Sequence, residues 1–265
     1  MSDTYENELA HAERMAVEAG KLLRGAFGRV SAREKGPSDL VTEADTQSQA
    51  LIASMITDVF PDHTLLAEEE GVRPDPAKPW KWIVDPLDGT INFAHGFPFW
   101  CVSIALEHKG TIVVGVIHDP ISGVTYSARR GGGTQRNGEP VQPSRTTELR
   151  SSLISAGLPT GFAADAERQL ALFKTFSSET HSVRRTGSTA LNLALLSAGG
   201  FDVYYTTSVH PWDVAAGILL VTESGGTVTA LDGSDYHLDQ PTLLATNGLL
   251  HSEAVARVEA AWPPR

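Results

Sequence analysis

The spacing of hydrophobic positions predicts two helices at the start of the chain and a sheet after them. Apolar residues recur every three or four positions over residues 5–27 and again from Asp45 to Phe60, which is typical of amphipathic helices. Residues 29–42 have little periodicity and contain Gly36-Pro37, so they are predicted to form a loop. Between residues 64 and 126, short apolar runs alternate with turn residues. These runs predict a meandering, largely antiparallel sheet.

The second half of the sequence mixes helical and strand patterns. Helical spacing or strand-like runs are found at residues 165–180, 187–199, 201–205 and 213–224. A helix pair, then a sheet, then alternating helices and strands predicts a layered α/β or α+β fold. We expect one unit over residues 1–265, with a soft division into an N-terminal part, 1–147, and a C-terminal part, 148–265.

The charge balance argues against partners that are themselves polyanions. The chain has 21 Lys and Arg against 32 Asp and Glu, which gives a formal net charge of -11. Its field repels nucleic acids and anionic membranes, so we expect neither as a general partner. A small anionic ligand would need local positive charge, and a bound metal ion supplies it.

The single cysteine and the first residues indicate the compartment. Cys101 has no second cysteine with which to form an intramolecular disulfide, and residues 1–6 lack the basic start and apolar run of a secretion signal. No stretch approaches 18 uninterrupted apolar residues. We therefore expect a cytoplasmic protein without a membrane span.

Two aspartates follow an apolar strand pattern at residues 82–90. Asp85 and Asp88 could converge on one cation, and a helix beginning near Thr90 would turn the N–H groups of Gly89 and Thr90 toward an anion. Asp-Pro and Asp-Gly are also common turn dipeptides, so an ordinary surface turn explains the same residues. Both interpretations stay open on this segment alone.

Three further acidic segments each have a structural explanation of their own. Thr42 to Asp45 suits a helix N-cap, Glu68 to Glu70 suits a solvated charge run, and Asp213 suits the first turn of a helix. A cleft that collects acids from all these segments would need cations, because carboxylates about 4 Å apart repel by several kcal/mol. Oxygen ligands without a Cys or His cluster favour Mg²⁺ or Mn²⁺ over Zn²⁺.

The combination of these motifs, in this order, resembles the inositol monophosphatase family. The matching segments are Asp39–Asp45, the Glu-Glu pair, Asp85–Phe93, Trp212–Gly217 and Glu223–Gly226. The resemblance implies alternating α-β-α-β-α layers, the sugar-phosphatase fold of inositol monophosphatase and fructose-1,6-bisphosphatase. It also implies a Mg²⁺-dependent, lithium-sensitive phosphatase that acts on a small phosphorylated metabolite, and a homodimer.

The resemblance also implies a set of metal ligands. Glu68, Asp85 and the backbone carbonyl of Leu87 would hold one Mg²⁺. Asp85, Asp88 and Asp213 would hold a second, and Glu68 would help to hold a third, weaker ion. Mn²⁺ could substitute for Mg²⁺.

Catalytic and phosphate-binding roles are carried over in the same way. Gly89 and Thr90 would bind the phosphate through their backbone N–H groups. Thr90 and Glu68 would position the water that attacks phosphorus directly, and Asp45 would support Thr90. Glu69 remains a rival for the role of Glu68, since the two acids are adjacent.

The substrate is the least defined part of the prediction. Thr206 stands where the family carries a glutamate thought to bind inositol, and Gly187, Ser188 and Thr189 resemble another part of the substrate wall or simply a helix start. Lys35 is either a phosphate contact or a solvated lysine. Inositol 1-phosphate is the expected substrate. Fructose 1,6-bisphosphate, histidinol phosphate and a nucleotide 3′-phosphate are alternatives.

Other classes fit the residues less well. A haloacid-dehalogenase-type phosphatase needs its two aspartates two positions apart, whereas Asp85 and Asp88 are three apart. A cysteine phosphatase needs an arginine six positions after its cysteine, whereas Glu107 occupies that position after Cys101. A regulatory, protein-binding dimer remains the non-enzyme alternative.

Overall fold

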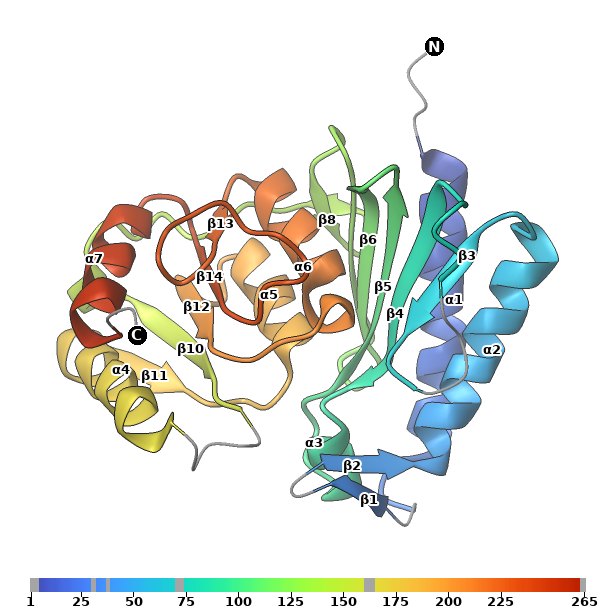
Figure 1. The fold of residues 1–265 in the computed structure, drawn as a ribbon, viewed down its shortest axis with the longest axis horizontal. Coiled ribbons are helices and arrows are strands. Elements are labelled where there is room, and N and C mark those ends of the chain that lie inside the picture. The colour runs from blue at the N-terminus through green and yellow to red at the C-terminus, as the bar shows by residue number, and fades with distance from the viewer. Residues whose placement is uncertain (1–4, 30–31, 37–38, 70–73, 160–164, 263–265) are drawn as a thin grey trace.

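The computed structural model describes residues 5–29, 32–36, 39–69, 74–159 and 165–262, and Figure 1 shows their arrangement. Within these ranges no helix is both long and apolar enough to cross a membrane. Two large sheets and three layers of helices alternate across the molecule.

The N-terminal part is built on a seven-stranded sheet whose strands follow one another in chain order. Only the first pair, β3 with β4, is parallel, and the later neighbours are antiparallel. This confirms the predicted meandering sheet. The strands are β3 (Thr64–Ala67), β4 (Trp80–Asp88), β5 (Cys101–His108), β6 (Thr111–Asp119), β7 (Val124–Arg129), β8 (Thr134–Arg136) and β9 (Glu139–Pro140).

Helices α1 (Glu6–Ala26) and α2 (Glu43–Val59) cover the outer face of this sheet (Figure 1). The apolar stripe of α1, including Ala12, Ala16 and Leu23, is fully buried against the strands. The alanines of this stripe let the helix axis approach the sheet closely, and larger side chains such as Leu23 and Trp82 fill the remaining space. The periodicity of the sequence therefore predicted both helices correctly.

The inner face of the same sheet packs on α5 (Thr189–Ser197) and α6 (Pro211–Ser224). Close approach depends on glycine: a Cβ at Gly115 of β6 would lie 2.8 Å from the backbone oxygen of Ala216, and a Cβ at Gly217 would overlap Leu193. Both helices are apolar nearly all round, as expected for elements that lie between two sheets.

The C-terminal part contains a five-stranded sheet of order β11-β10-β12-β14-β13. Its inner face also packs on α5 and α6. A short 3-10 helix, Leu149–Ser151, precedes it. The strands are β10 (Leu153–Gly157), β11 (Ser182–Arg184), β12 (Val203–Thr206), β13 (Thr227–Thr229) and β14 (Leu243–Thr246).

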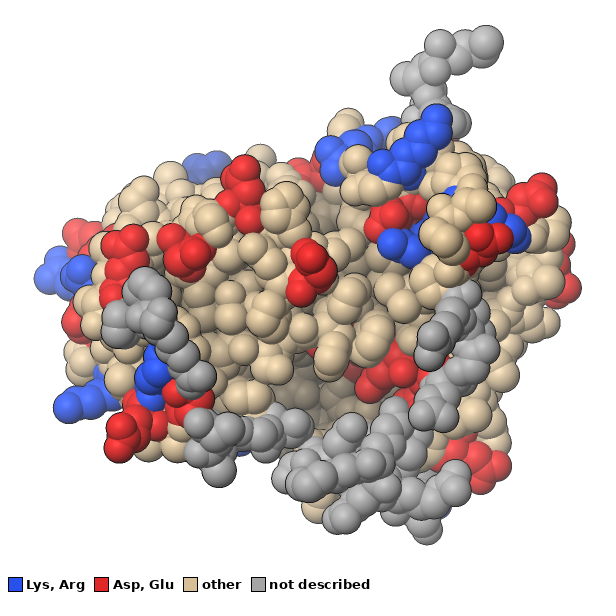
Figure 2. All heavy atoms as spheres, in the orientation of Figure 1, with Lys and Arg blue, Asp and Glu red and all other residues tan. Residues whose placement is uncertain are grey.

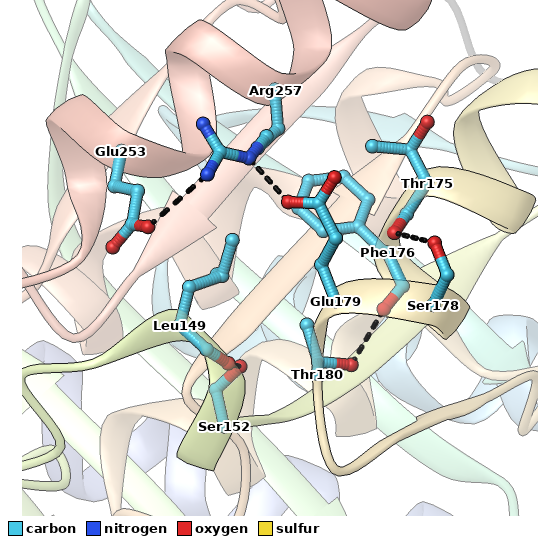
Figure 3. Close-up of polar contacts among 9 residues, drawn as sticks. All are labelled: Leu149, Ser152, Thr175, Phe176, Ser178, Glu179, Thr180, Glu253 and Arg257. Carbon is cyan, nitrogen blue, oxygen red and sulfur yellow. Dashed lines mark hydrogen bonds and ion pairs between the residues drawn. The ribbon is translucent and has the colours of Figure 1, made fainter.

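Helices α4 (Ala166–Glu179) and α7 (His251–Ala261) cover the outer face of the second sheet. Figure 3 shows Arg257 of α7 paired with Glu179 of α4, and with Glu253 of its own helix at 3.5 Å. The layers therefore run α1/α2, sheet, α5/α6, sheet, α4/α7, which confirms the α-β-α-β-α fold.

The structure differs from the sequence prediction at residues 29–42. Instead of a loop, β1 (Ala32–Gly36) and β2 (Asp39–Thr42) form an antiparallel hairpin in which Gly36 pairs with Asp39. Strands of five and four residues contain too few positions for alternation to be visible in the sequence. The side chains of residues 32–36 and 39–41, which include Lys35, lie outside the described part of the chain.

Candidate active site

Asp85 and Asp88 lie at the end of β4, where its pairing with β5 becomes irregular. The register shifts between Asp85, opposite Ser103, and Asp88, opposite Cys101. Pro86 fits this irregularity because it has no N–H to donate to a neighbouring strand. Oδ1 of Asp85 accepts a hydrogen bond from the backbone N of Leu87 at 3.0 Å. Both carboxylates are buried, so the segment is not the ordinary surface turn that its dipeptides allowed.

The carboxylate of Asp88 joins the end of β4 to the start of α5. Its Oδ2 accepts hydrogen bonds from the hydroxyl of Ser188 and from the backbone N of Ala190, the latter at 2.7 Å. Oδ1 accepts a longer bond, 3.3 Å, from the backbone N of Thr189. The thiol of Cys101 lies 3.7 Å from Oδ2. Ser188 and Thr189, predicted as substrate wall, are thus placed against a predicted metal ligand.

Asp213 comes from the opposite side of the site, in the first turn of α6. Its Oδ2 accepts a hydrogen bond from the backbone N of His210 at 2.8 Å, so the helix-capping explanation of this residue is also correct. Glu68 follows β3, and its backbone N donates to Val84 of β4 at 3.3 Å. That bond continues the β3–β4 pairing and places Glu68 next to the end of β4.

These acids act on one another electrostatically. Burial raises the pKa of Asp85 well above its ordinary value, and the charges of Glu68, Asp88 and Asp213 raise it further. Burial also raises the pKa of Asp213 well above the ordinary value, and Asp88 and then Glu68 add to the shift. Burial raises the pKa of Asp88, but the hydrogen bonds from Ser188 and α5 oppose that effect. Four acids from three separate segments therefore share one region.

Glu69 differs from its neighbour Glu68 in its contacts. Its backbone N donates to the side-chain oxygen of Gln49 at 3.0 Å, and its carbonyl accepts from the Gln49 amide at 3.2 Å. Among the charges that raise the pKa of Asp85, that of Glu68 has the largest effect. These contacts favour Glu68 over its neighbour. Glu70 lies outside the described residues.

Asp45 links the start of α2 to Thr90. Its Oδ2 accepts from the backbone N and the hydroxyl of Thr42 at 2.9 and 2.5 Å, which forms a capping box. Its Oδ1 lies 3.1 Å from the Thr90 hydroxyl, which also lies 3.0 Å from the carbonyl of Leu87. A hydroxyl has one proton, so it donates to one of these oxygens at a time and keeps lone pairs that can accept from a water.

Gly89 occupies the tight turn between β4 and the short helix α3 (Thr90–Ala94). It has φ 97°, a left-handed conformation that favours glycine. A Cβ there would lie 3.1 Å from the backbone oxygen of Phe99 and 3.2 Å from Trp100. Glycine is therefore required both by the backbone angle and by the close packing against Phe99 and Trp100.

The chemistry of the donor set fits a hard divalent cation. Oδ2 of Asp85 and Oδ1 of Asp213 accept no hydrogen bond from the described residues, and no described Lys or Arg forms an ion pair with Asp85, Asp88 or Asp213. Figure 2 shows acidic side chains beside the central hollow and most basic ones toward the periphery. Within the described ranges, no three Asp, Glu, His or Cys side chains already surround one point as ion ligands do.

A cavity of about 280 Å³ extends from Asp88 along the start of α5. Its lining includes Asn92 of α3, Arg185 and Gly187 of the β11–α5 loop, and Tyr204 of β12. Thr206 does not line it: this side chain is buried, and its hydroxyl contacts the backbone of Ser208 at 3.3 Å. The structure therefore brings Gly187, Ser188 and Thr189 to the cavity, and it does not bring Thr206 there.

Two residues of this cavity were not singled out as site residues by sequence reasoning. Asn92 was noted only as part of a family motif, yet its amide donates to the carbonyls of Phe99 and Thr186 at 2.7 and 2.8 Å. Arg185 gave no signal, because an arginine near a helix start is ordinary surface sequence. Only the fold shows that it borders the same cavity as Asp88.

Curated proteins similar to this chain differ in their named roles. The chain is 40% identical over 258 residues to a protein named inositol-1-monophosphatase from Synechocystis sp., with 95% of this chain and 88% of that protein covered. It is 35% identical over 242 residues to a protein named Nus factor SuhB from Salmonella typhimurium, with 90% of this chain and 91% of that protein covered.

A solved structure agrees with the fold and the family. The inositol monophosphatase structure from Anabaena (Nostoc) sp. matches with a TM-score of 0.88 and 36% identity, and the match covers 96% of each chain. The model of the family described as inositol monophosphatase matches residues 4–262, nearly the whole sequence. With these similarities added to the site geometry, the chain belongs to the inositol monophosphatase family.

Proposed function

We propose that this protein is a Mg²⁺-dependent phosphomonoesterase that hydrolyses a small polyol or sugar phosphate, with inositol 1-phosphate as the first candidate. The observation that carries the proposal is the gathering of the buried Asp85 and Asp88 with the half-buried Asp213, whose charges repel one another and have no described basic partner. Such a group is stable as carboxylates only with cations between them.

The proposed ligands fall into two overlapping sets. Glu68, Asp85 and the carbonyl of Leu87 would hold one Mg²⁺, and Asp85, Asp88 and Asp213 a second, while a third, weaker ion would also use Glu68. Mg²⁺ keeps several waters and takes only some of its oxygens from protein, so phosphate oxygens would complete the sites. When bound, the ions neutralise phosphate charge and lower the pKa of water.

The residues of the chain then have separate tasks. Backbone N–H groups of Gly89 and Thr90 bind the phosphate, because they lie at the N-terminal end of α3. The Thr90 hydroxyl donates to Asp45 or to the Leu87 carbonyl and accepts from the attacking water with a free lone pair. Glu68 contacts the same water, and Asp45 is a positioning residue fixed by Thr42. The water attacks phosphorus directly, and no phosphorylated side chain forms.

Two observations support inositol 1-phosphate as the substrate. The wall formed by Gly187, Ser188 and Thr189 borders the cavity, and the protein named inositol-1-monophosphatase in Synechocystis is 40% identical to this chain. Fructose 1,6-bisphosphate, histidinol phosphate and a nucleotide 3′-phosphate remain the alternative substrates. Thr206 lacks the carboxylate that would favour inositol. We also propose a homodimer of the reducing cytoplasm.

Assays with and without Mg²⁺ test the enzyme class. We expect hydrolysis of inositol 1-phosphate or p-nitrophenyl phosphate at millimolar Mg²⁺ and none in EDTA. Comparison of kcat/KM across inositol, fructose, histidinol and nucleotide phosphates then ranks the substrates. Failure of all of them would favour the second candidate, a regulatory protein-binding role, which the relative named Nus factor SuhB supports.

A further inference from the structure

We propose that Arg185 binds the second phosphate of a polyol or sugar bisphosphate, so that it raises kcat/KM for such a substrate relative to a monophosphate. This inference rests on the proposed phosphatase function and specifies its substrate class. The 280 Å³ cavity is lined by an acid, Asp88, and by a base, Arg185. Arg185 is the one Lys or Arg among the described lining residues.

Arg185 is the lining residue whose charged group has no partner. Among the described residues, no hydrogen bond, ion pair or ring contact involves its guanidinium, and the side chain is exposed. The neighbouring Arg184 differs, because its guanidinium donates to the Ser182 hydroxyl and to the Val183 carbonyl. Arg184 also does not line the cavity.

Most other polar side chains of the cavity are already satisfied by the protein. The Thr186 hydroxyl donates to Oδ1 of Asn192 at 2.7 Å, and the Tyr204 hydroxyl donates to Thr189 at 3.0 Å. The Asn92 amide is used by two backbone carbonyls. The free donors of Arg185 are therefore the groups best placed to bind a strongly charged part of a ligand.

The backbone next to Arg185 is held firmly. The carbonyl of Thr186 accepts from Asn92, and Gly187, at φ 89°, packs so closely that a Cβ would lie 2.9 Å from the Asn92 amide nitrogen. Asn92 itself belongs to α3, whose first residue, Thr90, is part of the proposed phosphate cradle. The Asn92 side chain thus ties the backbone next to Arg185 to the helix that carries this cradle.

Charge and size make a second phosphate the fitting partner. The reacting phosphate would lie at the Asp88 end with the cations, which leaves the distal end of the substrate near Arg185. A planar guanidinium binds phosphate with paired, charge-assisted hydrogen bonds, whereas a neutral hydroxyl gains much less from it. The cavity is small for a ligand site, which suits a molecule of hexose size.

The test compares fructose 1,6-bisphosphate with inositol 1-phosphate. We expect wild type to hydrolyse both substrates, and we expect the ratio of their kcat/KM values to depend on Arg185. Arg185→Gln should raise KM for the bisphosphate about tenfold, as expected for loss of one charge-assisted contact, and should leave inositol 1-phosphate within about twofold. Arg185→Lys should have a KM for the bisphosphate between those of wild type and Arg185→Gln. Arg184→Gln is the matched control, because it removes the same charge one residue away, and it should change neither substrate.

A second readout uses the product. Fructose 6-phosphate retains the distal phosphate, so its inhibition constant should rise with Arg185→Gln, while inhibition by inorganic phosphate should not change. Equal losses on both substrates, or an equal effect of Arg184→Gln, would overturn the proposal. The proposal would also be overturned if wild type prefers inositol 1-phosphate and Arg185→Gln leaves the ratio of the two kcat/KM values unchanged. A wild type inactive on every phosphate ester would instead overturn the proposed function.

Discussion

The carboxylate of Asp88, at the end of the first sheet, accepts a 2.7 Å hydrogen bond from the backbone N of Ala190, more than 100 positions later in the chain. It thereby satisfies a free N–H at the start of α5, a task that usually falls to a local side chain. The same acid is a proposed metal ligand. Asp88 therefore contributes to both the fold and the proposed chemistry, whereas Asp213, among the described residues, is hydrogen-bonded only within its own helix start.

This difference separates the effects of two similar substitutions. Asp213→Asn and Asp88→Asn should each abolish turnover, because each removes a ligand charge. Asp88→Asn should also lower the free energy of unfolding by about 1–3 kcal/mol, since charge-assisted bonds to buried donors are lost. Asp213→Asn should not lower the free energy of unfolding, because it removes a charge that Asp88 and Glu68 repel. Kinetics and urea unfolding of both variants measure this, and full activity of either at saturating Mg²⁺ would refute its role.

Thr90→Ala should lower kcat more than it raises KM. The hydroxyl is proposed to orient the water in the transition state, whereas phosphate binding uses backbone groups that alanine keeps. Thr90→Ser is the control, because it retains the hydroxyl near Asp45 and Leu87 and should recover most of kcat. Steady-state kinetics on one substrate suffice. A change confined to KM would show that Thr90 contributes to binding alone.

The metal-free protein should become less stable as the pH rises from acid toward neutral. The raised pKa values of Asp85 and Asp213 mean that the folded state holds these protons more tightly than the unfolded state does. Stability therefore falls with rising pH above the ordinary aspartate value of 3.8, and the loss is complete above the raised values. Thermal unfolding in EDTA across this range measures it. Asp213→Asn should flatten the slope, and an unchanged slope would contradict the assignment.

His63, which directly precedes β3, should make the free energy of unfolding depend on pH in the opposite direction. Its Nδ1 accepts a hydrogen bond from the buried Trp82 indole at 3.0 Å, and an indole N–H can only donate. Burial lowers the pKa of His63, while Asp62 opposes this and Lys78 and His108 add to it. A lowered pKa costs stability as the pH falls through and below the ordinary value of 6.5.

His63→Gln tests that dependence. The glutamine carbonyl can accept from Trp82 but does not titrate, so the variant should lose less stability than wild type between about pH 7 and pH 5, where an unfolded histidine gains its proton. Thermal unfolding of both proteins in parallel isolates the contribution of His63 from those of other histidines. Parallel curves would show that protonation of His63 has no effect on stability.

The parts of the fold that sequence reasoning predicted are those with long, repeated patterns. The stripe of α1 spans six turns of apolar positions, and the runs of β4 to β7 are separated by turn residues. The pattern did not show β10, β13 or β14, because strands of three to five residues contain too few positions for alternation to be visible, and it did not show α7. The soft division near residue 147 falls between β9 and β10 and stays a prediction.

At the site, local patterns identified the acids but not their partners. Asp85 and Asp88 stand out because they follow an apolar strand. The contact of Asp88 with Ser188 and α5, and the place of Arg185 beside the same cavity, depend on two sheets packing on shared helices. Thr206 shows the converse: its position in the motif predicted a substrate contact, yet its strand turns the side chain into the interior.

Titration calorimetry with Mg²⁺ tests the central proposal most directly. Wild type should bind the ion with a measurable heat, and Asp85→Asn should bind it far more weakly, because Asp85 belongs to both proposed ligand sets. Glu69→Gln, which changes the acid next to Glu68, should bind as wild type does. Equal binding by wild type and Asp85→Asn, or no binding by wild type at millimolar Mg²⁺ with product phosphate present, would contradict the account.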